Sequence, residues 1–501
     1  MNKTFDYIIV GGGISGLYFS YKLMNKTNNF IILEKKPRLG GRIKTINMNC
    51  LTYDAGAVRI SKSHTKAMSL IKELKLNNQL VEQSNKKTFF IKNKFVKSKN
   101  KELDEIVKKG KKLNKNIRIS NTFKGIGELI STTEKTNMAI IKTGYNSESL
   151  KLNFNNFLNE TKTYNNVYYK FKDGLSKIID VLSCKIGKDK ILTSSFVENI
   201  EYKNKIFKVK TNNKILKCKK IILAIPKNDL LKLKILSNYS NLLESVSSNN
   251  YIRVYAKYPK INNKYWFEDL DTIITDKPLR KIIPVDKENG LIQISYCDNN
   301  YANILNNYNI SGKLYLFIEK NLKEIFPKLN IPKPTYLRAN YWDNGTHWWL
   351  PHVDSSKMID NILQPNNEMP LFIIGEAYSN KQAWIEGALS TSDILLTKLN
   401  INNIKIKQKG GTTKYKKYTL KKVKKHNKKY TLKEVKKHNK KNDAWVIYKK
   451  GVYNITKWIP LHPGGDVILY GLGKDMTKMF DMVGHSVFAK NKLETYKIGY
   501  I

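Results

Sequence analysis

The chain has 501 residues and a mass of 58.0 kDa, with 41% hydrophobic and 11% aromatic residues. This composition can bury large cores, so it excludes a wholly disordered protein and predicts about two to four folded units. There is no apolar run of the ~18 residues that a membrane-spanning helix needs, and no signal-peptide pattern precedes the first glycines. We therefore expect a soluble, cytoplasmic protein. Its cysteines are too few and too scattered for a disulfide framework or a zinc cluster: Cys50, Cys184, Cys218 and Cys297.

The charge is strongly positive, with 90 basic against 41 acidic residues and a formal net charge of +49. Such a balance suggests nucleic acid as a partner. However, only seven of the basic residues are arginines and 83 are lysines, whereas proteins that read bases or grip phosphates usually favour arginine. We interpret most of the charge as compositional bias and expect no nucleic acid partner. A basic protein that binds nucleic acid or an anionic membrane stays an alternative.

The N-terminal segment has the pattern of a βαβ unit. Residues 5–10 have the pattern of a buried strand. A glycine turn and an apolar stretch to Leu23 follow, and residues 30–34 form a second apolar run. Strand, glycine turn, helix and strand in this order predict a Rossmann-like α/β domain.

The following segments predict a mixed α+β region. Residues 62–190 are mostly helical in pattern, and residues 191–226 alternate like a small sheet. Residues 251–350 are strand-like and aromatic, and residues 370–399 read as strand, turn and helix.

A lysine-rich segment separates this region from the C-terminal part. Residues 405–441 contain 17 lysines and one acid, Glu434. A 12-residue repeat lies inside it, since residues 417–428 and 429–440 differ only at Lys422 and Glu434. Two copies are too few for a solenoid, and like charges keep a linker extended. We interpret the duplication as a lengthened linker, with the first copy as the spare one because the second runs into folded sequence.

The glycine turn has the spacing of a dinucleotide site. Gly11, Gly13 and Gly16 form G-x-G-x-x-G directly after the first strand. The first glycine permits the tight turn, the second lets the backbone approach a pyrophosphate at the helix N-terminus, and the third lets the helix pack on the sheet. Glu34 ends the second strand 18 residues after Gly16, where a carboxylate would accept ribose hydroxyls.

Further motifs, in the same order, resemble the flavin-containing amine oxidase superfamily, which includes monoamine, polyamine and L-amino-acid oxidases and protoporphyrinogen oxidase. They are Leu39-Gly40-Gly41-Arg42, the segment 53–60, Phe196-Val197, Ala224-Ile225-Pro226, Gly375-Glu376-Ala377 and the segment 384–389. The resemblance covers about 400 residues and implies a bound FAD. The cofactor-binding residues that it implies are Gly11, Gly13, Ser15, Gly16, Glu34, Lys35, Gly41, Arg42, Ala57, Val58, Arg59, Val197, Gly375, Glu376, Trp384 and Ala388.

The resemblance also implies a substrate pocket flanked by two aromatic rings. Trp384 takes one of these positions and Trp348 the other, although ordinary core packing is the alternative for both. Many relatives carry a lysine that holds a water beside the flavin, and here the matching residue is Arg253. An arginine stays charged and cannot shuttle a proton, so this departure puts amine oxidation in question. No cysteine follows Cys297, so we expect a non-covalent FAD.

The last 72 residues resemble cytochrome b5. The segment starts at Tyr430-Thr431-Leu432 and contains His462-Pro463-Gly464-Gly465 and Gly484-His485-Ser486. A b-type haem that only transfers electrons is held by two axial imidazoles. His462 and His485 are the ligands that the resemblance implies, with haem b as the second cofactor. No apolar tail follows the motif, so we expect no integral membrane anchor.

We therefore expect an FAD-dependent oxidoreductase of the amine oxidase type, which oxidises a small substrate, an amine, and passes electrons to its own b-type haem and on to an external acceptor or molecular oxygen. The alternative enzyme is a desaturase or isomerase that acts on a carotenoid- or porphyrinogen-like substrate. The expected fold is a Rossmann-like FAD-binding domain with an inserted mixed α+β substrate domain, plus a small α+β haem domain. The expected boundaries are 1–62, 191–235 and 365–400 for the FAD-binding parts, 63–190 and 236–364 for the substrate parts, 401–429 for the linker and 430–501 for the haem domain.

Overall fold

The computed structural model forms two compact units, residues 1–406 and 407–501. Within the described residues, no helix is long and apolar enough to cross a membrane. The residues that the structure describes are 3–48, 51–96, 99–161, 167–401, 428–456, 458–459, 465–482, 493–494 and 496–501.

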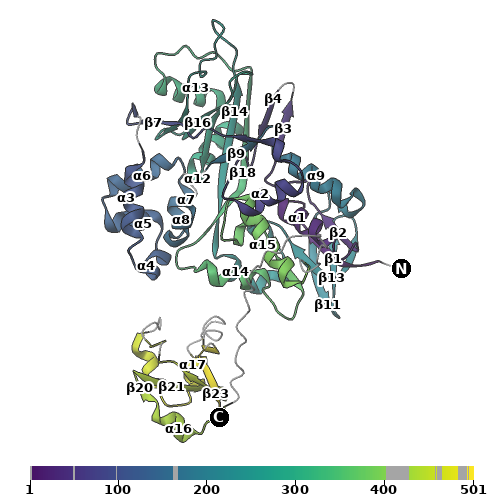
Figure 1. Cartoon of the computed structure of the whole chain (residues 1–501), viewed down its shortest axis with the longest axis vertical. Helices are drawn as coiled ribbons and strands as arrows, with labels where there is room; N and C mark the ends of the chain where they lie inside the picture. The colour runs from purple at the N-terminus through teal and green to yellow at the C-terminus, as the bar shows by residue number, and fades with distance from the viewer. Residues whose placement is uncertain are drawn as a thin grey trace, which may run out of the picture. The chain divides into compact units, whose positions relative to one another are not determined.

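The first unit contains a mixed sheet with the βαβ unit at its centre (Figure 1). In the described part of the chain its order is β10-β2-β1-β13-β12-β11, and β19 pairs with β13. The pairs around β1 are parallel, as the βαβ pattern predicts, while β11, β12 and β13 form an antiparallel meander. The strands are β1 (Thr4–Val10), β2 (Phe30–Leu33), β10 (Ile191–Leu192), β11 (Val197–Lys203), β12 (Ile206–Thr211), β13 (Ile215–Leu223) and β19 (Leu371–Ile373).

Both faces of this sheet are buried, which explains the continuous apolar run of its first strand. Ile8 and Val10 join one hydrophobic cluster, and Ile9 between them joins a second one on the opposite face. The second cluster contains the apolar residues of the helices that cover that face: α1 (Ile14–Leu23), α2 (Thr65–Glu73), α9 (Ser176–Ile186) and α15 (Ile385–Lys398).

A second sheet forms the rest of the first unit, in the order β18-β14-β17-β16-β15-β7-β8 within the described residues. Most of its pairs are antiparallel, but β15 and β7 are parallel. Its strands are β7 (Lys87–Ile91), β8 (Lys94–Val96), β14 (Val246–Lys257), β15 (Thr272–Thr275), β16 (Lys281–Asp286), β17 (Leu291–Asp298) and β18 (Tyr336–Trp349).

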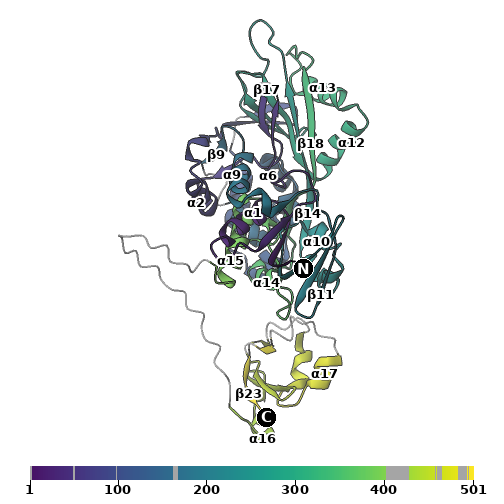
Figure 2. The same cartoon turned by 90° about the vertical axis from the view of Figure 1, so that its right-hand side faces the viewer.

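The helices of the inserted region lie in two groups. One group lies to one side of the sheets in Figure 1 and contains α3 (Lys101–Gly110), α4 (Lys115–Ser120), α5 (Phe123–Ile130), α6 (Thr133–Thr143), α7 (Ser147–Lys151) and α8 (Phe154–Thr161). The other, α12 (Asn299–Ile310) and α13 (Leu314–Ile325), covers one face of the second sheet (Figure 2). The expectation that residues 251–350 are all strand-like is therefore wrong, because two amphipathic helices interrupt the strands there.

Short elements complete the first unit. The prediction that residues 62–190 are mostly helical is confirmed, although strands also occur in that range. The remaining elements are β3 (Thr45–Met48), β4 (Leu51–Asp54), β5 (Ile60–Ser61), β6 (Leu80–Glu82), β9 (Tyr168–Phe171), α10 (Lys227–Leu230), α11 (Ser240–Leu243) and α14 (Ser355–Leu363).

The second unit is a small α+β fold. Its sheet has the order β20-β21-β22-β23 among the described residues, and its apolar core includes Tyr448, Ile455 and Phe480. Its elements are α16 (Leu432–Lys437), β20 (Asn439–Lys440), β21 (Asp443–Tyr448), β22 (Gly451–Asn454), α17 (Thr477–Met482) and β23 (Lys497–Tyr500).

The second copy of the 12-residue repeat is part of this fold, since Tyr430 and Val435 are buried in its core. The residue that differs between the copies completes a capping box. Thr431 Oγ1 accepts a hydrogen bond of 3.2 Å from the Glu434 backbone N–H, and Glu434 Oε2 accepts one of 2.6 Å from the Thr431 N–H. The first copy has Lys422 at the position of Glu434, and a lysine cannot accept this bond. Apart from Lys428, that copy lies outside the described residues.

We predict that the capping box stabilises the second unit. Thr431→Ala removes the side-chain acceptor at the start of α16 and should cost about 1 kcal/mol, so amide hydrogen exchange in β21 should become about fivefold faster in the full chain. Glu434→Lys, which copies the first repeat, should also accelerate exchange, because it replaces the acceptor by a cation at a helix N-terminus. Lys433→Ala, in the same turn, is the control. Unchanged exchange in both cap variants would contradict the prediction.

Candidate functional site

The first unit contains a cavity of about 2290 Å³ that receives residues from both sheets. Pockets for a single small ligand usually measure about 300–1,000 Å³, so this one has room for a dinucleotide and a second molecule. The predicted site residues that line it are Gly11, Gly13, Ser15, Glu34, Lys35, Gly41, Arg42, Ala57, Val58, Arg59, Val197, Arg253, Trp348, Gly375, Glu376, Trp384 and Ala388.

The three glycines of the first turn have different surroundings. A Cβ atom on Gly11 would lie 2.4 Å from the Ala224 carbonyl oxygen, and one on Gly16 would lie 2.1 Å from the Gly11 oxygen. A Cβ on Gly13 would meet no atom within 4 Å. Gly11 and Gly16 therefore permit close packing of turn, helix and sheet, while Gly13 leaves the backbone open at the N-terminus of α1, where an anion binds well.

Glu34 lies at the end of β2 beside this turn. Its carboxylate is buried and accepts hydrogen bonds of 2.8 Å from the backbone N–H groups of Gly12 and Lys36. A carboxylate has about four acceptor positions, so two hydroxyl groups could still donate to it. Lys35, next in the chain, forms an ion pair of 2.7 Å with Asp229.

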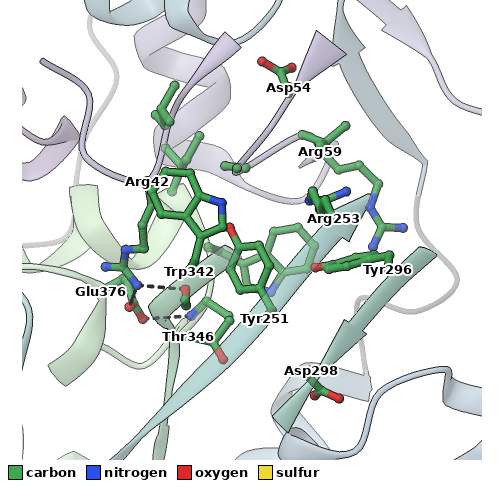
Figure 3. A pocket seen from close by; sticks show the side chains of 18 of the residues that line it. Arg42, Asp54, Arg59, Tyr251, Arg253, Tyr296, Asp298, Trp342, Thr346 and Glu376 are labelled. Carbon is green, nitrogen blue, oxygen red and sulfur yellow. Dashed lines mark hydrogen bonds and ion pairs between the residues drawn. The ribbon is translucent and has the colours of Figure 1, made fainter. Parts of the chain in front are cut away.

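The carboxylate of Glu376 is the centre of a buried network (Figure 3). It accepts hydrogen bonds from Arg42 Nη1, from His347 Nδ1 at 2.6 Å and from the Ala383 N–H at 2.9 Å. Burial alone would raise the pKa of Glu376, but the charge of Arg42 and the contacts with His347 outweigh burial and lower this pKa to about 2. The pKa of His347 is lowered by burial, so a neutral imidazole donates to an ionised carboxylate.

Several polar groups on the cavity wall beside this network have no partner within the described residues. The Oδ1 atom of Asn344 and the Oγ1 atom of Thr346 are buried, and neither has a hydrogen-bond partner among the described residues. A Cβ on Gly375, which has a φ of 138°, would meet only Ser15 Oγ at 4.0 Å. Open backbone at two glycine turns and unpaired polar groups on the same cavity wall fit a bound polar cofactor.

The second sheet divides its two faces between core and cavity. In β14, Ile252 and Val254 belong to the hydrophobic cluster under α12 and α13, whereas Tyr251, Arg253 and Tyr255 line the cavity. This alternation places Arg253 in the cavity, 6% exposed, although the sequence pattern of β14 could not say which face would be covered.

The guanidinium group of Arg253 lies over the ring of Tyr296 on the neighbouring strand, 3.8 Å from its centroid (Figure 3). Arg253 Nη1 donates to Gln293 Oε1 at 3.0 Å, and its Nε is buried without a partner in the described part of the chain. These contacts fix a buried cation at the cavity wall.

The two predicted cage tryptophans both line the cavity, but each is held by other contacts. Trp384 Nε1 donates to Glu160 Oε2 at 3.2 Å, and its ring stacks on Tyr168 with centroids 6.0 Å apart. Trp348 Nε1 donates to Ser147 Oγ at 3.0 Å. Burial raises the pKa of Glu160 to about 7.

The cavity residues that the sequence analysis missed include Trp342, Tyr145, Tyr296 and Lys281. Trp342 stacks on Tyr251 with centroids 6.3 Å apart, and its Nε1 donates to the Ala55 oxygen at 2.9 Å. The other three come from segments without a motif: Lys281 lies on β16, Tyr296 on β17 and Tyr145 between α6 and α7, so only the tertiary fold brings them to the cavity.

The predicted haem ligands His462 and His485 lie outside the described residues. The described residues of the second unit supply its sheet and its apolar core, whose members include Ile459, Leu472 and Leu493.

Comparisons with known proteins match each end of the chain. Residues 9–74 match the NAD(P)-binding Rossmann-like domain, and residues 431–501 match the cytochrome b5-like Heme/Steroid binding domain. The C-terminal part is 47% identical over 85 residues to cytochrome b5 isoform B of Arabidopsis thaliana and 51% identical over 87 residues to a cytochrome b5 of Oryza sativa subsp. japonica. It is 49% identical over 91 residues to acyl-lipid (8-3)-desaturase B of Dictyostelium discoideum.

The two cytochrome b5 matches each cover 17% of this chain, and 54% and 55% of the Arabidopsis and Oryza proteins. The desaturase match covers 18% of this chain and 17% of the desaturase. The chain has the fold of a solved protoporphyrinogen oxidase-like protein from Exiguobacterium sp. 255-15, with a TM-score of 0.60 and 14% sequence identity. The match covers 80% of this chain and 100% of that protein's chain. The chain therefore carries a Rossmann-like domain at its N-terminus, within the fold of a protoporphyrinogen oxidase-like flavoprotein, and a cytochrome b5 domain at its C-terminus, a combination that supports a redox function.

Proposed function

We propose that the chain is an FAD-dependent oxidoreductase that takes two electrons from a small substrate and passes them to its own b-type haem. The observation that carries this proposal is the cavity, whose wall contains the open backbone at Gly13, the carboxylate of Glu34 and the unpaired polar groups near Glu376. FAD, when bound, supplies an acceptor for a hydride from the substrate.

Each of these residues would have a distinct task in holding the cofactor. The backbone at Gly13 and the N-terminus of α1 would bind the pyrophosphate, and Glu34 would accept hydrogen bonds from ribose hydroxyls. Arg42 is held by Glu376 and by the Gly345 oxygen at 3.1 Å, so its guanidinium group is fixed at the cavity before any ligand arrives.

The aromatic residues would keep water away from the reacting bond. Trp342, Tyr251 and Trp384 present ring surfaces to the cavity, and an apolar wall of this kind strengthens the electrostatic contacts inside. We infer from the tryptophan positions that a small amine is the substrate, with molecular oxygen or an external acceptor as the final oxidant.

The cytochrome b5 domain suggests where the electrons go. We infer that His462 and His485 ligate a b-type haem, which takes up one electron at a time and leaves no open position for oxygen. A covalent tether raises the effective concentration of one domain at the other, so strong charge complementarity between them is unnecessary.

A second candidate is a desaturation or dehydrogenation of a porphyrinogen- or carotenoid-like substrate. Two observations favour it: Arg253 stands where amine-oxidising relatives carry lysine, and a protein with the same fold is described as protoporphyrinogen oxidase-like. An amine panel distinguishes the two, because amine oxidation with oxygen releases ammonia and hydrogen peroxide.

We predict that two glycines of the first turn respond differently to alanine. Gly13→Ala should leave the unfolding midpoint of the first unit nearly unchanged, since a Cβ meets no atom and the φ of −75° suits alanine, but it should weaken FAD binding at least tenfold. Gly16→Ala should destabilise the unit itself, because its Cβ would overlap the Gly11 oxygen. Flavin content and thermal unfolding of both variants test this. A Gly13→Ala protein with full FAD content would contradict the assigned site.

We also predict reduction of the haem through the flavin. After anaerobic rapid mixing with an oxidisable substrate, flavin absorbance should fall first and the reduced haem bands should then rise in the same molecules. His462→Ala should abolish haem binding and leave flavin reduction intact. If the flavin bleaches while the haem stays oxidised, transfer within the chain is wrong.

A further inference from the structure

Two buried basic side chains face the cavity from two strands of the second sheet that are separated by a third strand. Arg253 on β14 and Lys281 on β16 are 6% and 7% exposed, and β17 lies between their strands. Both contact the same ring, because the Arg253 guanidinium carbon is 3.8 Å and Lys281 Nζ is 5.8 Å from the centroid of Tyr296. Side chains on the strands of a packed sheet are held in fixed positions, so the two basic groups meet at the Tyr296 ring on a rigid wall.

Neither side chain forms an ion pair within the described part of the chain. Lys281 Nζ lies 3.2 Å from the centroid of the Tyr145 ring, and no carboxylate is within salt-bridge distance of it. Arg253 has one hydrogen bond, to Gln293, and its Nε has no partner among the described residues. Buried charges are normally paired, because an unpaired one is costly to remove from water.

Two buried carboxylates of the cavity wall, Asp54 and Asp298, act electrostatically on these side chains, and both already accept other hydrogen bonds. Asp54 accepts hydrogen bonds from Thr45 Oγ1 at 2.6 Å and from the Leu175 N–H at 3.0 Å. Asp298 accepts hydrogen bonds from the N–H groups of Asn146 at 2.9 Å and Ser147 at 2.8 Å, and from Ser147 Oγ at 2.6 Å. Burial, followed by the charges of Arg59 and Lys87, lowers the pKa of Lys281 well below its usual value, and Asp298 opposes this shift only in part. No carboxylate of the described residues pairs with Lys281, and a bound anion would favour its charged form.

The surroundings also indicate what kind of molecule would supply that charge. The rings of Tyr145, Tyr251 and Tyr296 surround the two cations, and Arg59 Nη2 donates to the Tyr145 hydroxyl at 3.2 Å. A guanidinium fork matches the two oxygens of a carboxylate, and tyrosine faces pack against a flat or apolar body. A ligand with a carboxylate next to an apolar or aromatic group would satisfy both features.

We propose that Arg253 and Lys281 bind a carboxylate group of the substrate, so that the substrate carries a carboxylic acid beside the group that is oxidised. To call this ligand a substrate assumes the proposed oxidation. Binding of a carboxylate at the site does not depend on that reaction. It gives Arg253 a task that a lysine holding a water could not perform, namely two-point recognition of an anion.

The test is calorimetric titration of the full chain, saturated with FAD, with three probes of one shape. Benzoate, benzamide and benzylamine share a ring but carry a negative, a neutral and a positive group. We expect benzoate to bind at least tenfold more tightly than benzamide, and benzylamine not to bind. Equal affinity for benzoate and benzamide would overturn the proposal, and this comparison needs no variant.

Variants locate the site. Arg253→Gln and Lys281→Met should each weaken benzoate binding at least tenfold and change benzamide binding less than twofold. Arg338→Gln and Lys328→Met remove matched charges from exposed positions outside the cavity and should leave both affinities unchanged. If Arg253→Gln does not fold, Arg253→Lys keeps the charge and loses the fork, and should weaken benzoate binding by a smaller factor. Benzoate affinity unchanged in Lys281→Met and in the Arg253 variant would overturn the proposal.

The outcome is separable from that of the proposed function. Benzoate binding without flavin reduction by any substrate would leave the carboxylate site standing and contradict the oxidation. Flavin reduction by a simple amine, with no preference for benzoate over benzamide, would support the oxidation and overturn the carboxylate site.

Discussion

The cavity of the first unit depends on the burial of one carboxylate. Glu376 lies at the end of β19 and accepts hydrogen bonds from Arg42, His347 and the Ala383 N–H, which come from three separate segments of the chain. A buried carboxylate is stable only when its oxygens are satisfied, so these segments must all be in place for any one of them to be stable. The glycine-arginine turn, the end of β18 and the turn before α15 are thereby joined into one wall.

The second sheet imposes the complementary constraint. Its strands have to bury apolar side chains under α12 and α13 and, on the opposite face, to present polar ones to the cavity. Strict alternation does this in β14, and a change of register between Val254 and Tyr255 adjusts the pairing with β17. The same face therefore carries tyrosine rings, Arg253 and Lys281 side by side, which no single strand could supply.

The parts of this site that were predictable from the sequence are those in which function and local backbone geometry coincide. The βαβ turn is such a part, since Gly11 and Gly16 are required by packing and Gly13 by the approach of a ligand. The Rossmann-like and cytochrome b5 domains were predicted correctly for this reason. Helices α12 and α13 were not, because their apolar residues face a sheet formed by distant strands and the polar asparagines between them resemble loop sequence.

Lys281 shows why composition conceals function in such a chain. It is one of 83 lysines, so its residue type carries almost no information. An exposed lysine is nearly free of cost, and a mutational bias can therefore accumulate lysines on the surface without effect on stability. A buried lysine without an ion pair opposes folding, and it is retained only where some interaction offsets that cost. Among the described residues, burial at the cavity wall without an ion pair is thus the property that separates Lys281 and Arg253 from the remainder of the +49 charge.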